Sequence, residues 1–359
     1  MLQRLLSIAL LAALCLCGSS VAAPSATAAL AFPAIAAAAP VQSVILIGWD
    51  GAQREHVQQC LKRGELPNLA ALGQAGALVD IDVTETTDTK AGWAQILTGY
   101  SAKLTGVYSN MKFQPIPPGY SIFERLEQHY GADGIATLAV IGKDAHVGNF
   151  APQRIALNAA GDAPAAGLKK GKGARKAWRQ KMKQGQVVED GGQKYLEIPG
   201  GPYYITAQHM DLFENGLHEN DKVGARALEA LEQYKGQRFF LFVHFADVDT
   251  KGHKFGENRD EYTAALIDDD AWLGRIEAKL AELGLAGSTL VYVTADHGFD
   301  EALRTHKDAP YVFLASNDPS LRVPAGGAGN RSDITPTILA RLGLDLSAYE
   351  PPLTGRPLR

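Results

Sequence analysis

The chain has 359 residues, of which 46% are hydrophobic and 21% are charged, and its formal net charge at pH 7 is −4. This is the composition of a globular protein with one large or two modest domains. Because general nucleic-acid binders are usually basic, the negative charge argues against nucleic-acid binding.

Residues 1–23 have the pattern of a secretory signal peptide, with an early arginine, an apolar run and then small residues. The apolar run is too short to predict a membrane span, so no transmembrane helix is expected in the mature chain. We expect cleavage near Ala22 or Ala23 and export to the periplasm or the exterior. A lipid anchor on Cys15 or Cys17 is disfavoured, because Leu precedes each where a small residue is expected.

Residues 24–41 are rich in Ala and Pro and are interpreted as a flexible linker. Export normally permits disulfides. The mature chain nevertheless keeps one cysteine, Cys60, so no internal disulfide is expected.

The rest of the chain alternates apolar runs with amphipathic segments. The apolar runs predict buried strands at residues 44–48, 77–83, 136–142, 238–245, 288–295 and 311–315. Helical patterns cover residues 53–63, 67–75, 90–98, 221–235, 260–284 and 332–343. Strands separated by helices indicate an α/β fold, with a mostly parallel central sheet and helices on both faces.

Residues 150–220 break this alternation and are rich in Gly, Pro and charge. We interpret them as an inserted cap subdomain beside the sheet. They include a basic run, KKGKGARKAWRQKMK, at residues 169–183. Such a run is ordinarily a solvated, mobile loop. The alternative is a surface that attracts anionic substrates.

Aspartates and histidines stand at or just beyond the ends of three predicted strands. They are Asp50 after the first strand, Asp249 and His253 after the strand ending near residue 245, and Asp296, His297 and His306 after the strand ending near residue 295. In an open α/β sheet, sites form at the carboxyl ends of strands. Taken singly, each Asp fits a turn or cap and each His a surface position. Their joint occurrence at one edge predicts a metal centre, better suited to Zn²⁺ or Mn²⁺ than to Ca²⁺ or Mg²⁺.

The stretch TETTDTKAGWAQILTG, residues 84–99, is unusually rich in threonine. Threonines are common at helix starts, where the hydroxyl caps free N–H groups. Capping is therefore the ordinary interpretation of the threonine that begins the predicted helix at 90–98, and catalysis is the alternative.

The order of these motifs resembles the alkaline phosphatase superfamily. WDG is followed by a threonine before an LTG helix, then by a DxxxHxxG motif, a strand ending in ADHG and a further His. The resemblance is closest to the type I phosphodiesterase/nucleotide pyrophosphatase and sulfatase-like branches. It covers nearly the whole mature chain, including LPNLAAL (66–72), DITPTILARLGL (333–344) and TGRPL (354–358). It implies an alkaline phosphatase-like catalytic domain over residues 42–359.

The resemblance also implies two divalent metal ions, most often Zn²⁺ and alternatively Mn²⁺. The ligands of one ion would be Asp249, His253 and His306, and those of the other would be Asp50, Asp296 and His297.

The same resemblance implies a nucleophile, which would also bind metal, ten residues before the Gly of the LTG motif. Counting back from Gly99 gives Thr89. Threonine is a weak nucleophile at neutral pH, and metal coordination would lower the pKa of its hydroxyl. A helix N-terminus behind it would favour the developing negative charge.

Further contacts follow from the resemblance or from position. Lys90 is either an exposed first-turn lysine or a charge-balancing group beside the phosphoryl oxygens. The IGKDAHVG segment resembles the GKWHLG segment of sulfatases, which implies that Lys143 and His146 contact the transferred group. Asn110 lies in a family-like loop and is expected to bind substrate. His244 is either a core-edge histidine or a substrate contact.

Two departures narrow the expected reaction. Nucleotide pyrophosphatases have an Asn three residues after the nucleophile, and here that residue is Gly92, which weakens a prediction of nucleotide specificity. Sulfatases convert a Cys or Ser to formylglycine, which Thr89 cannot become. DTKAGW at residues 88–93 faintly resembles a phosphopentomutase motif, but those mutases work in the cytoplasm and the export signal argues against that role.

We therefore expect an exported, metal-dependent hydrolase of small anionic phosphate esters, with diesters slightly favoured over monoesters. Alternatives on the same scaffold are phosphonate hydrolysis, phosphomutase activity and phosphoethanolamine-type transfer. A non-catalytic metal-binding module is a further alternative, since folds outlive functions. Such a module would be expected to have lost a ligand or the nucleophile, and all of those positions hold suitable residues.

Overall fold

The computed structural model describes residues 32–35, 41–323 and 325–359. The predicted signal peptide at residues 1–23 lies outside the described residues, as does most of the predicted linker at 24–41. None of the helices in the described ranges combines the length and the apolar content needed to cross a lipid bilayer.

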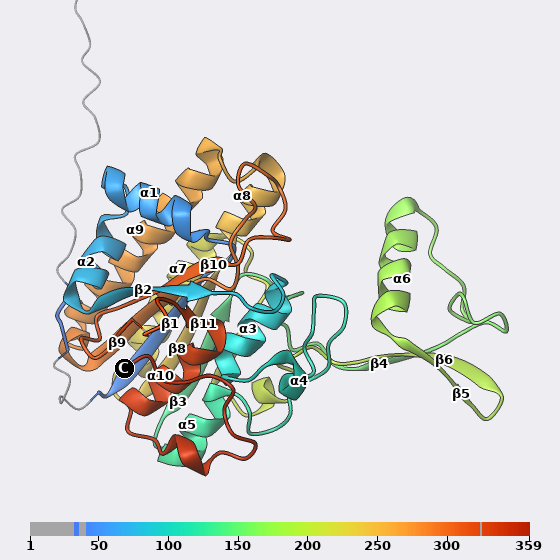
Figure 1. The fold of residues 1–359 in the computed structure, drawn as a ribbon. Coiled ribbons are helices and arrows are strands. Elements are labelled where there is room, and N and C mark those ends of the chain that lie inside the picture. Colours follow the sequence, from blue (N-terminus) through green and yellow to red (C-terminus); the bar gives the residue numbers. More distant parts are fainter. Residues whose placement is uncertain (1–31, 36–40, 324) are drawn as a thin grey trace, which may run out of the picture.

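A central eight-stranded sheet runs in the order β11-β2-β10-β9-β1-β8-β3-β7 (Figure 1). Pairing is parallel from β9 through β1, β8 and β3 to β7, whereas β10 is antiparallel to both of its neighbours. The strands are β1 Ser43–Trp49, β2 Ala77–Asp82, β3 Ala136–Ile141, β7 Leu212–Glu214, β8 Phe239–Phe245, β9 Thr289–Thr294, β10 Tyr311–Ser316 and β11 Gly329–Asn330. The predicted mostly parallel sheet is confirmed.

Helices cover both faces of this sheet (Figure 1). One layer packs around the longest helix, α9, and the other packs around α10. The first layer is α1 Arg54–Arg63, α2 Pro67–Ala75, α7 Asn220–Tyr234, α8 Asp247–Phe255 and α9 Asp260–Glu282. The second is α3 Thr89–Thr98, α5 Ile122–Tyr130 and α10 Ile334–Arg341, with the short α4 Ala102–Thr105 after α3. Single 3₁₀ turns are η1 Thr206–Gln208, η2 Ala286–Ser288, η3 Arg331–Asp333 and η4 Leu346–Ala348.

The central strands are apolar on both faces because each face is covered by a helical layer. Every residue of β1, β3, β8 and β9 is buried. Strands of this kind appear in a sequence as continuous apolar runs rather than as alternating patterns. This burial explains why the four apolar runs at 44–48, 136–142, 238–245 and 288–295 predict strands correctly.

A second, antiparallel sheet lies within the predicted insertion, with the order β4-β6-β5. Its strands are β4 Gln153–Ala156, β5 Gln186–Asp190 and β6 Gln193–Ile198, and α6 Lys172–Gln184 packs on them. We call residues 153–198 the arm, because this segment stands away from the main body (Figure 1). The arm has a small core of its own, formed by Leu157, Trp178, Leu196 and Ile198. Most of the basic run at 169–183 is helical rather than a loop.

Candidate metal centre and active site

The aspartates and histidines predicted as ligands meet beyond the carboxyl ends of β1, β8 and β9. Two overlapping groups of three residues have potential ligand atoms all within 4.8 Å of one another. The groups are Asp50, Asp296 and His297, and Asp249, His297 and His306. In the second group His297 stands where the sequence predicts His253.

His253 lies beside that second group. Its Nε2 is 3.4 Å from Asp249 Oδ1, and its ring centroid is 5.0 Å from that of His306. Its Nδ1 lies 2.9 Å from the Arg304 carbonyl oxygen, which can only accept, so Nδ1 donates and Nε2 is the nitrogen available to a metal. His253 can therefore join the group as a further ligand.

The turn after β1 brings two of these carboxylates together. Gly51 has φ 79°, a conformation in which glycine is favoured. A Cβ atom on Gly51 would lie 2.9 Å from Asp249 Cβ. Without that atom, the Asp249 N–H can donate to the Asp50 carbonyl oxygen at 3.0 Å. The WDG turn thus sets the approach of α8 to the end of β1.

Three carboxylate oxygens at the centre lack hydrogen-bond partners. They belong to buried side chains and are Asp50 Oδ1, Asp249 Oδ1 and Asp296 Oδ2. A buried carboxylate is costly unless it is paired or coordinates a metal. Together with the imidazoles of His297 and His306, these oxygens form a donor set suited to divalent cations such as Zn²⁺ or Mn²⁺. The described residues therefore fit a metal centre.

Lys143 is the ammonium group among these carboxylates. Its Nζ is 3.0 Å from Asp50 Oδ2 and also donates to Asp249 Oδ2. Burial alone would lower the pKa of Lys143, but the two carboxylates raise it above its ordinary value, so the group is charged. One ammonium cannot balance three carboxylates. Burial and the nearby Asp50 charge accordingly raise the pKa of Asp296 well above its usual range.

His297 is held in the tautomer that a metal ligand needs. Its Nδ1 lies 2.9 Å from the Gly298 carbonyl oxygen, so Nδ1 donates and Nε2 carries the lone pair. Burial and the neighbouring His306 lower the pKa of His297 to about 4, which keeps the ring neutral. Its Nε2 is 3.4 Å from Asp296 Oδ2 and 3.2 Å from Thr89 Oγ.

Thr89 is the first residue of α3 and is buried at the centre. Its hydroxyl donates to His297 Nε2 at 3.2 Å. The helix behind it is held by Asn110, whose Oδ1 accepts from the Lys90 N–H at 2.9 Å and whose own N–H donates to Asp88 Oδ2 at 3.0 Å. Thr89 therefore combines a helix N-terminus with direct contact to a candidate ligand.

Lys90 is buried rather than exposed, so the alternative of a solvated first-turn lysine is wrong. Its Nζ donates to the Ala145 carbonyl oxygen and lies 4.7 Å from the centroid of the Phe113 ring. Burial lowers the pKa of Lys90 to about 8, although Asp88 and Asp144 act in the opposite direction. Lys90, Asn110 and His146 line one cavity. Burial and the positive charges of Lys143 and Lys90 lower the pKa of His146 to about 3, so its ring is neutral.

His244, considered above as a substrate contact, is fully buried behind Asp50. Its Nε2 is 3.0 Å from Asp50 Oδ2, and its ring packs edge-on against Trp93, with centroids 5.2 Å apart. Together with Lys143, it helps to hold the pKa of Asp50 well below the value that burial alone would give. This placement favours a positioning role, in which His244 orients a candidate ligand.

Arg331 also supports the candidate site, although no sequence motif predicts this. It is fully buried, and it donates to the Asp296 carbonyl oxygen at 2.7 Å and to the Thr86 carbonyl oxygen at 2.8 Å. It thereby ties the ADHG turn to the segment before Thr89. In the sequence, Arg331 is recognisable only as an arginine directly before the predicted helix at 332–343. Arginines at such positions are also common on protein surfaces, so this signal does not indicate a buried role.

Gly92 has a structural reason to be glycine. It lies one turn into α3, against the ADHG turn, and a Cβ atom there would be 2.8 Å from Asp296 Cβ and 3.0 Å from the Asp296 carbonyl oxygen. The Asn that the resemblance leads one to expect at this position therefore has no room. Helix α3 can approach the candidate ligand Asp296 this closely because Gly92 has no side chain.

We expect Gly92→Ala to destabilise the protein by about 1–3 kcal/mol, as overpacking of a close-packed interior does. The measurement is the free energy of unfolding in guanidinium chloride. Gly287→Ala is the matched control, because nothing lies within 4 Å of a Cβ atom at that position, and its effect should stay within about 0.5 kcal/mol. Equal stabilities of the two variants would contradict the close contact at Gly92.

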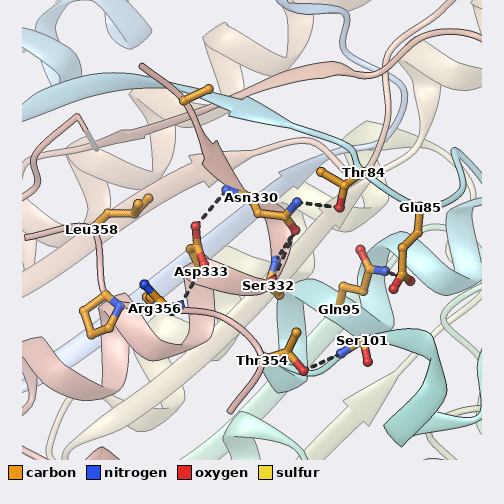
Figure 2. Close-up of a pocket in the computed structure, with 12 residues that line it drawn as sticks. Thr84, Glu85, Gln95, Ser101, Asn330, Ser332, Asp333, Thr354, Arg356 and Leu358 are labelled. Atoms are coloured by element: carbon orange, nitrogen blue, oxygen red, sulfur yellow. Dashed lines mark hydrogen bonds between the residues drawn. The ribbon is translucent and has the colours of Figure 1, made fainter. Parts of the chain in front are cut away.

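A separate cavity of about 460 Å³ lies on the other side of α3, under the C-terminal segment. Figure 2 shows polar side chains from several segments around it, including Glu85, Gln95, Asn330 and Asp333. Much of its wall is internally bonded: Asn330 Nδ2 donates to Thr84 Oγ1 at 2.7 Å, and the Asn330 N–H donates to Asp333 Oδ2 at 2.8 Å. None of the candidate ligands lines either cavity, but Lys90, the residue directly after Thr89, lines the cavity described above, so that cavity adjoins the start of α3.

Comparison with known proteins places the chain in the family that its motifs resemble. Residues 44–336 match the family model described as type I phosphodiesterase / nucleotide pyrophosphatase. Among curated proteins, a 2,3-bisphosphoglycerate-independent phosphoglycerate mutase of Syntrophotalea carbinolica is 31% identical over 206 residues, which are 48% of this chain and 38% of the mutase. The chain spans well under half the length of the curated relatives that it matches.

Solved structures share the fold at low sequence identity. A protein in the alkaline phosphatase superfamily from Vibrio parahaemolyticus has a TM-score of 0.52 and 15% identity, covering 89% of this chain and 70% of that one. A phosphonate monoester hydrolase from Silicibacter pomeroyi has a TM-score of 0.50 and 18% identity, covering 89% and 76%. At these identities the likeness establishes the fold and leaves the substrate open.

Proposed function

The chain belongs to the type I phosphodiesterase/nucleotide pyrophosphatase family of the alkaline phosphatase superfamily, and on this premise we propose that it is a metal-dependent hydrolase of phosphate esters. Thr89 is the proposed nucleophile. Export is part of the proposal and is based on residues 1–23, which have the pattern of a signal peptide.

The observation that carries the proposal is the position of Thr89. Its hydroxyl lies 3.2 Å from His297 Nε2, at the start of a helix, among three buried carboxylates with unpartnered oxygens. A threonine that served only as a helix cap would not need these neighbours. A non-catalytic module would not need to keep a hydroxyl buried beside candidate ligands.

The residues proposed to hold two divalent ions are Asp249, His253 and His306 for one ion, and Asp50, Asp296 and His297 for the other. When bound, such ions neutralise phosphoryl charge and lower the pKa of a neighbouring hydroxyl. The mixed carboxylate and imidazole donor set favours Zn²⁺, with Mn²⁺ as the alternative.

In the proposed reaction, the Thr89 oxygen attacks phosphorus while its proton leaves to solvent. The bond from phosphorus to the ester oxygen breaks, and the departing alkoxide takes up a proton from water. This step leaves a phosphothreonine. Attack of water on the phosphorus then releases phosphate or a phosphomonoester and returns the hydroxyl to Thr89.

Nearby side chains support this course. Lys143 contacts two of the carboxylates. It carries a positive charge that can move toward the phosphoryl oxygens once those carboxylates bind cations. Lys90 and Asn110 hold the first turn of α3 and line the adjoining cavity. Phosphomutase, transferase and phosphonate chemistry on the same residues would differ only in what accepts or carries the phosphoryl group.

The reaction class can be tested with three chromogenic esters. Metal-free protein is titrated with Zn²⁺ or Mn²⁺ and assayed on bis-p-nitrophenyl phosphate, p-nitrophenyl phosphate and p-nitrophenyl sulfate. We expect metal-dependent turnover of both phosphates, with the diester faster, and little turnover of the sulfate, because Thr89 cannot form formylglycine. Absent or metal-independent turnover of all three esters would overturn the proposal. Sulfate turnover above phosphate turnover would assign the chain to sulfatase chemistry instead.

A further inference from the structure

Building on the proposed function, we infer that the organic group of the substrate is polyhydroxylated, as in a sugar phosphate diester, and that the arm helps to bind it. The inference rests on the cavity of about 400 Å³ beside Lys90. This volume is within the range of small-molecule sites.

The cavity is unusually rich in carboxamides. The side chains that line it include five amides, namely Asn110, Asn149, Gln180, Gln184 and Asn215. Lys90, Asp144 and His146 add one ammonium, one carboxylate and one imidazole, and Met111 and Phe150 provide apolar surface. The amides come from four separate segments of the chain, so only the tertiary structure assembles them.

Several of these amide groups have unused hydrogen-bonding capacity. Asn149 and Asn215 bond to each other at 3.1 Å, and Asn110 Oδ1 accepts from the Lys90 N–H. No bond to another described residue is found for the side chains of Gln180 and Gln184. An amide both donates and accepts, as a hydroxyl group does, so neighbouring hydroxyls can use both functions of each side chain.

The same lining is poorly suited to a nucleobase. Phe150 is the one phenyl or indole ring among the described residues that line the cavity, and its ring packs edge-on against Phe113 at a centroid distance of 6.0 Å. Bases are typically held by stacking on aromatic faces. At Gly92 the helix also lacks room for the Asn of nucleotide pyrophosphatases. A single apolar surface next to many amides matches the C–H face and the hydroxyls of a sugar.

The arm contributes both glutamines of the cavity lining. Gln180 and Gln184 are four residues apart on α6, so they share one face of the helix. That face lines the same cavity as Lys90, the residue after the proposed nucleophile. The arm therefore acts as a specificity element for the organic group, while the main body carries the phosphoryl chemistry.

The test compares two diesters that release the same p-nitrophenol and differ only in the other substituent. These are glucose 6-(p-nitrophenyl phosphate) and methyl p-nitrophenyl phosphate. We expect kcat/KM to be at least about tenfold higher for the glucose diester. The double variant Gln180→Leu, Gln184→Leu should lower the glucose-to-methyl ratio about tenfold, as expected for the loss of two ordinary hydrogen bonds. Gln233→Leu, an exposed glutamine on α7, is the matched control and should leave the ratio unchanged.

A binding measurement separates this inference from the proposed reaction. Glucose 6-phosphate and methyl phosphate are titrated calorimetrically into metal-loaded full-length protein. We expect tighter binding of the sugar phosphate in the wild type, and loss of that difference in the double variant. If neither diester is turned over, the proposed reaction is overturned, and the binding measurement still decides whether the sugar site exists. Equal affinities, or a difference that survives in the double variant, would overturn the sugar site even if diesters are hydrolysed.

Discussion

Thr89→Ala should lower kcat on bis-p-nitrophenyl phosphate by at least about 10³-fold, as loss of a nucleophile generally does. The reason is that the hydroxyl at the start of α3, 3.2 Å from His297 Nε2, is the only part of Thr89 that can attack phosphorus. Thr89→Ser should retain a large part of the activity, because it keeps an oxygen at the same position. The measurement is steady-state turnover with saturating Zn²⁺.

Thr87→Ala is the matched control, since Thr87 lies two residues earlier in the same stretch. Its turnover should stay within a few-fold of wild type. Quenched reactions of wild-type protein should also trap phosphate on a peptide that contains Thr89. Near-normal turnover by Thr89→Ala would remove this residue from the mechanism, and phosphate on another peptide would identify its replacement.

Removing bound metal should abolish turnover and lower the melting temperature, and restoring Zn²⁺ should recover both. Three buried carboxylates with unpartnered oxygens and one balancing ammonium, Lys143, make the folded centre dependent on added positive charge. An ion present at 100 times its Kd stabilises the folded state by about 2.7 kcal/mol. For a domain of this size the shift in melting temperature is expected to be about 4 °C per ion. Differential scanning calorimetry with and without chelator measures it.

Asp296→Asn tests, at one candidate ligand, whether the stability of the protein depends on bound metal. The variant removes a carboxylate whose pKa is raised by burial and by Asp50, and it should lose most of the Zn²⁺-dependent stabilisation. Asp133→Asn, at an exposed position in the loop before β3, is the control and should respond to Zn²⁺ as the wild type does. A metal-free wild type as stable as the loaded protein would argue against a metal centre at these residues.

The α/β fold was predictable because its central strands are buried on both faces. Their apolar runs at 44–48, 136–142, 238–245 and 288–295 stand out from the helical patterns between them. The short edge strands β7 and β11 were not predicted, since two or three residues carry no periodic pattern. The helix α8 was also missed, because its glycine and polar residues resemble a loop although tertiary contacts hold it as a helix.

The candidate ligands could be chosen from sequence because strand ends converge at one edge of a parallel sheet. The structure brings them into two overlapping groups of three, Asp50, Asp296 and His297, and Asp249, His297 and His306, with potential ligand atoms within 4.8 Å of one another in each group. It also alters individual roles. Lys90 is buried rather than solvated, and His244 stands behind Asp50 with no place in the adjoining cavity.

The sequence by itself determined the fold class and the positions of the candidate Asp and His ligands, since these depend on local patterns and on chain order, whereas Thr89 was chosen from the resemblance to the alkaline phosphatase superfamily. Only the tertiary structure decided which side chains share a ligand group, why Gly92 has no side chain and that Arg331 ties the Asp296 turn to the segment before Thr89. It also placed Gln180 and Gln184 of the arm beside Lys90. These features depend on contacts between segments far apart in the chain, and local residue patterns do not encode such distances.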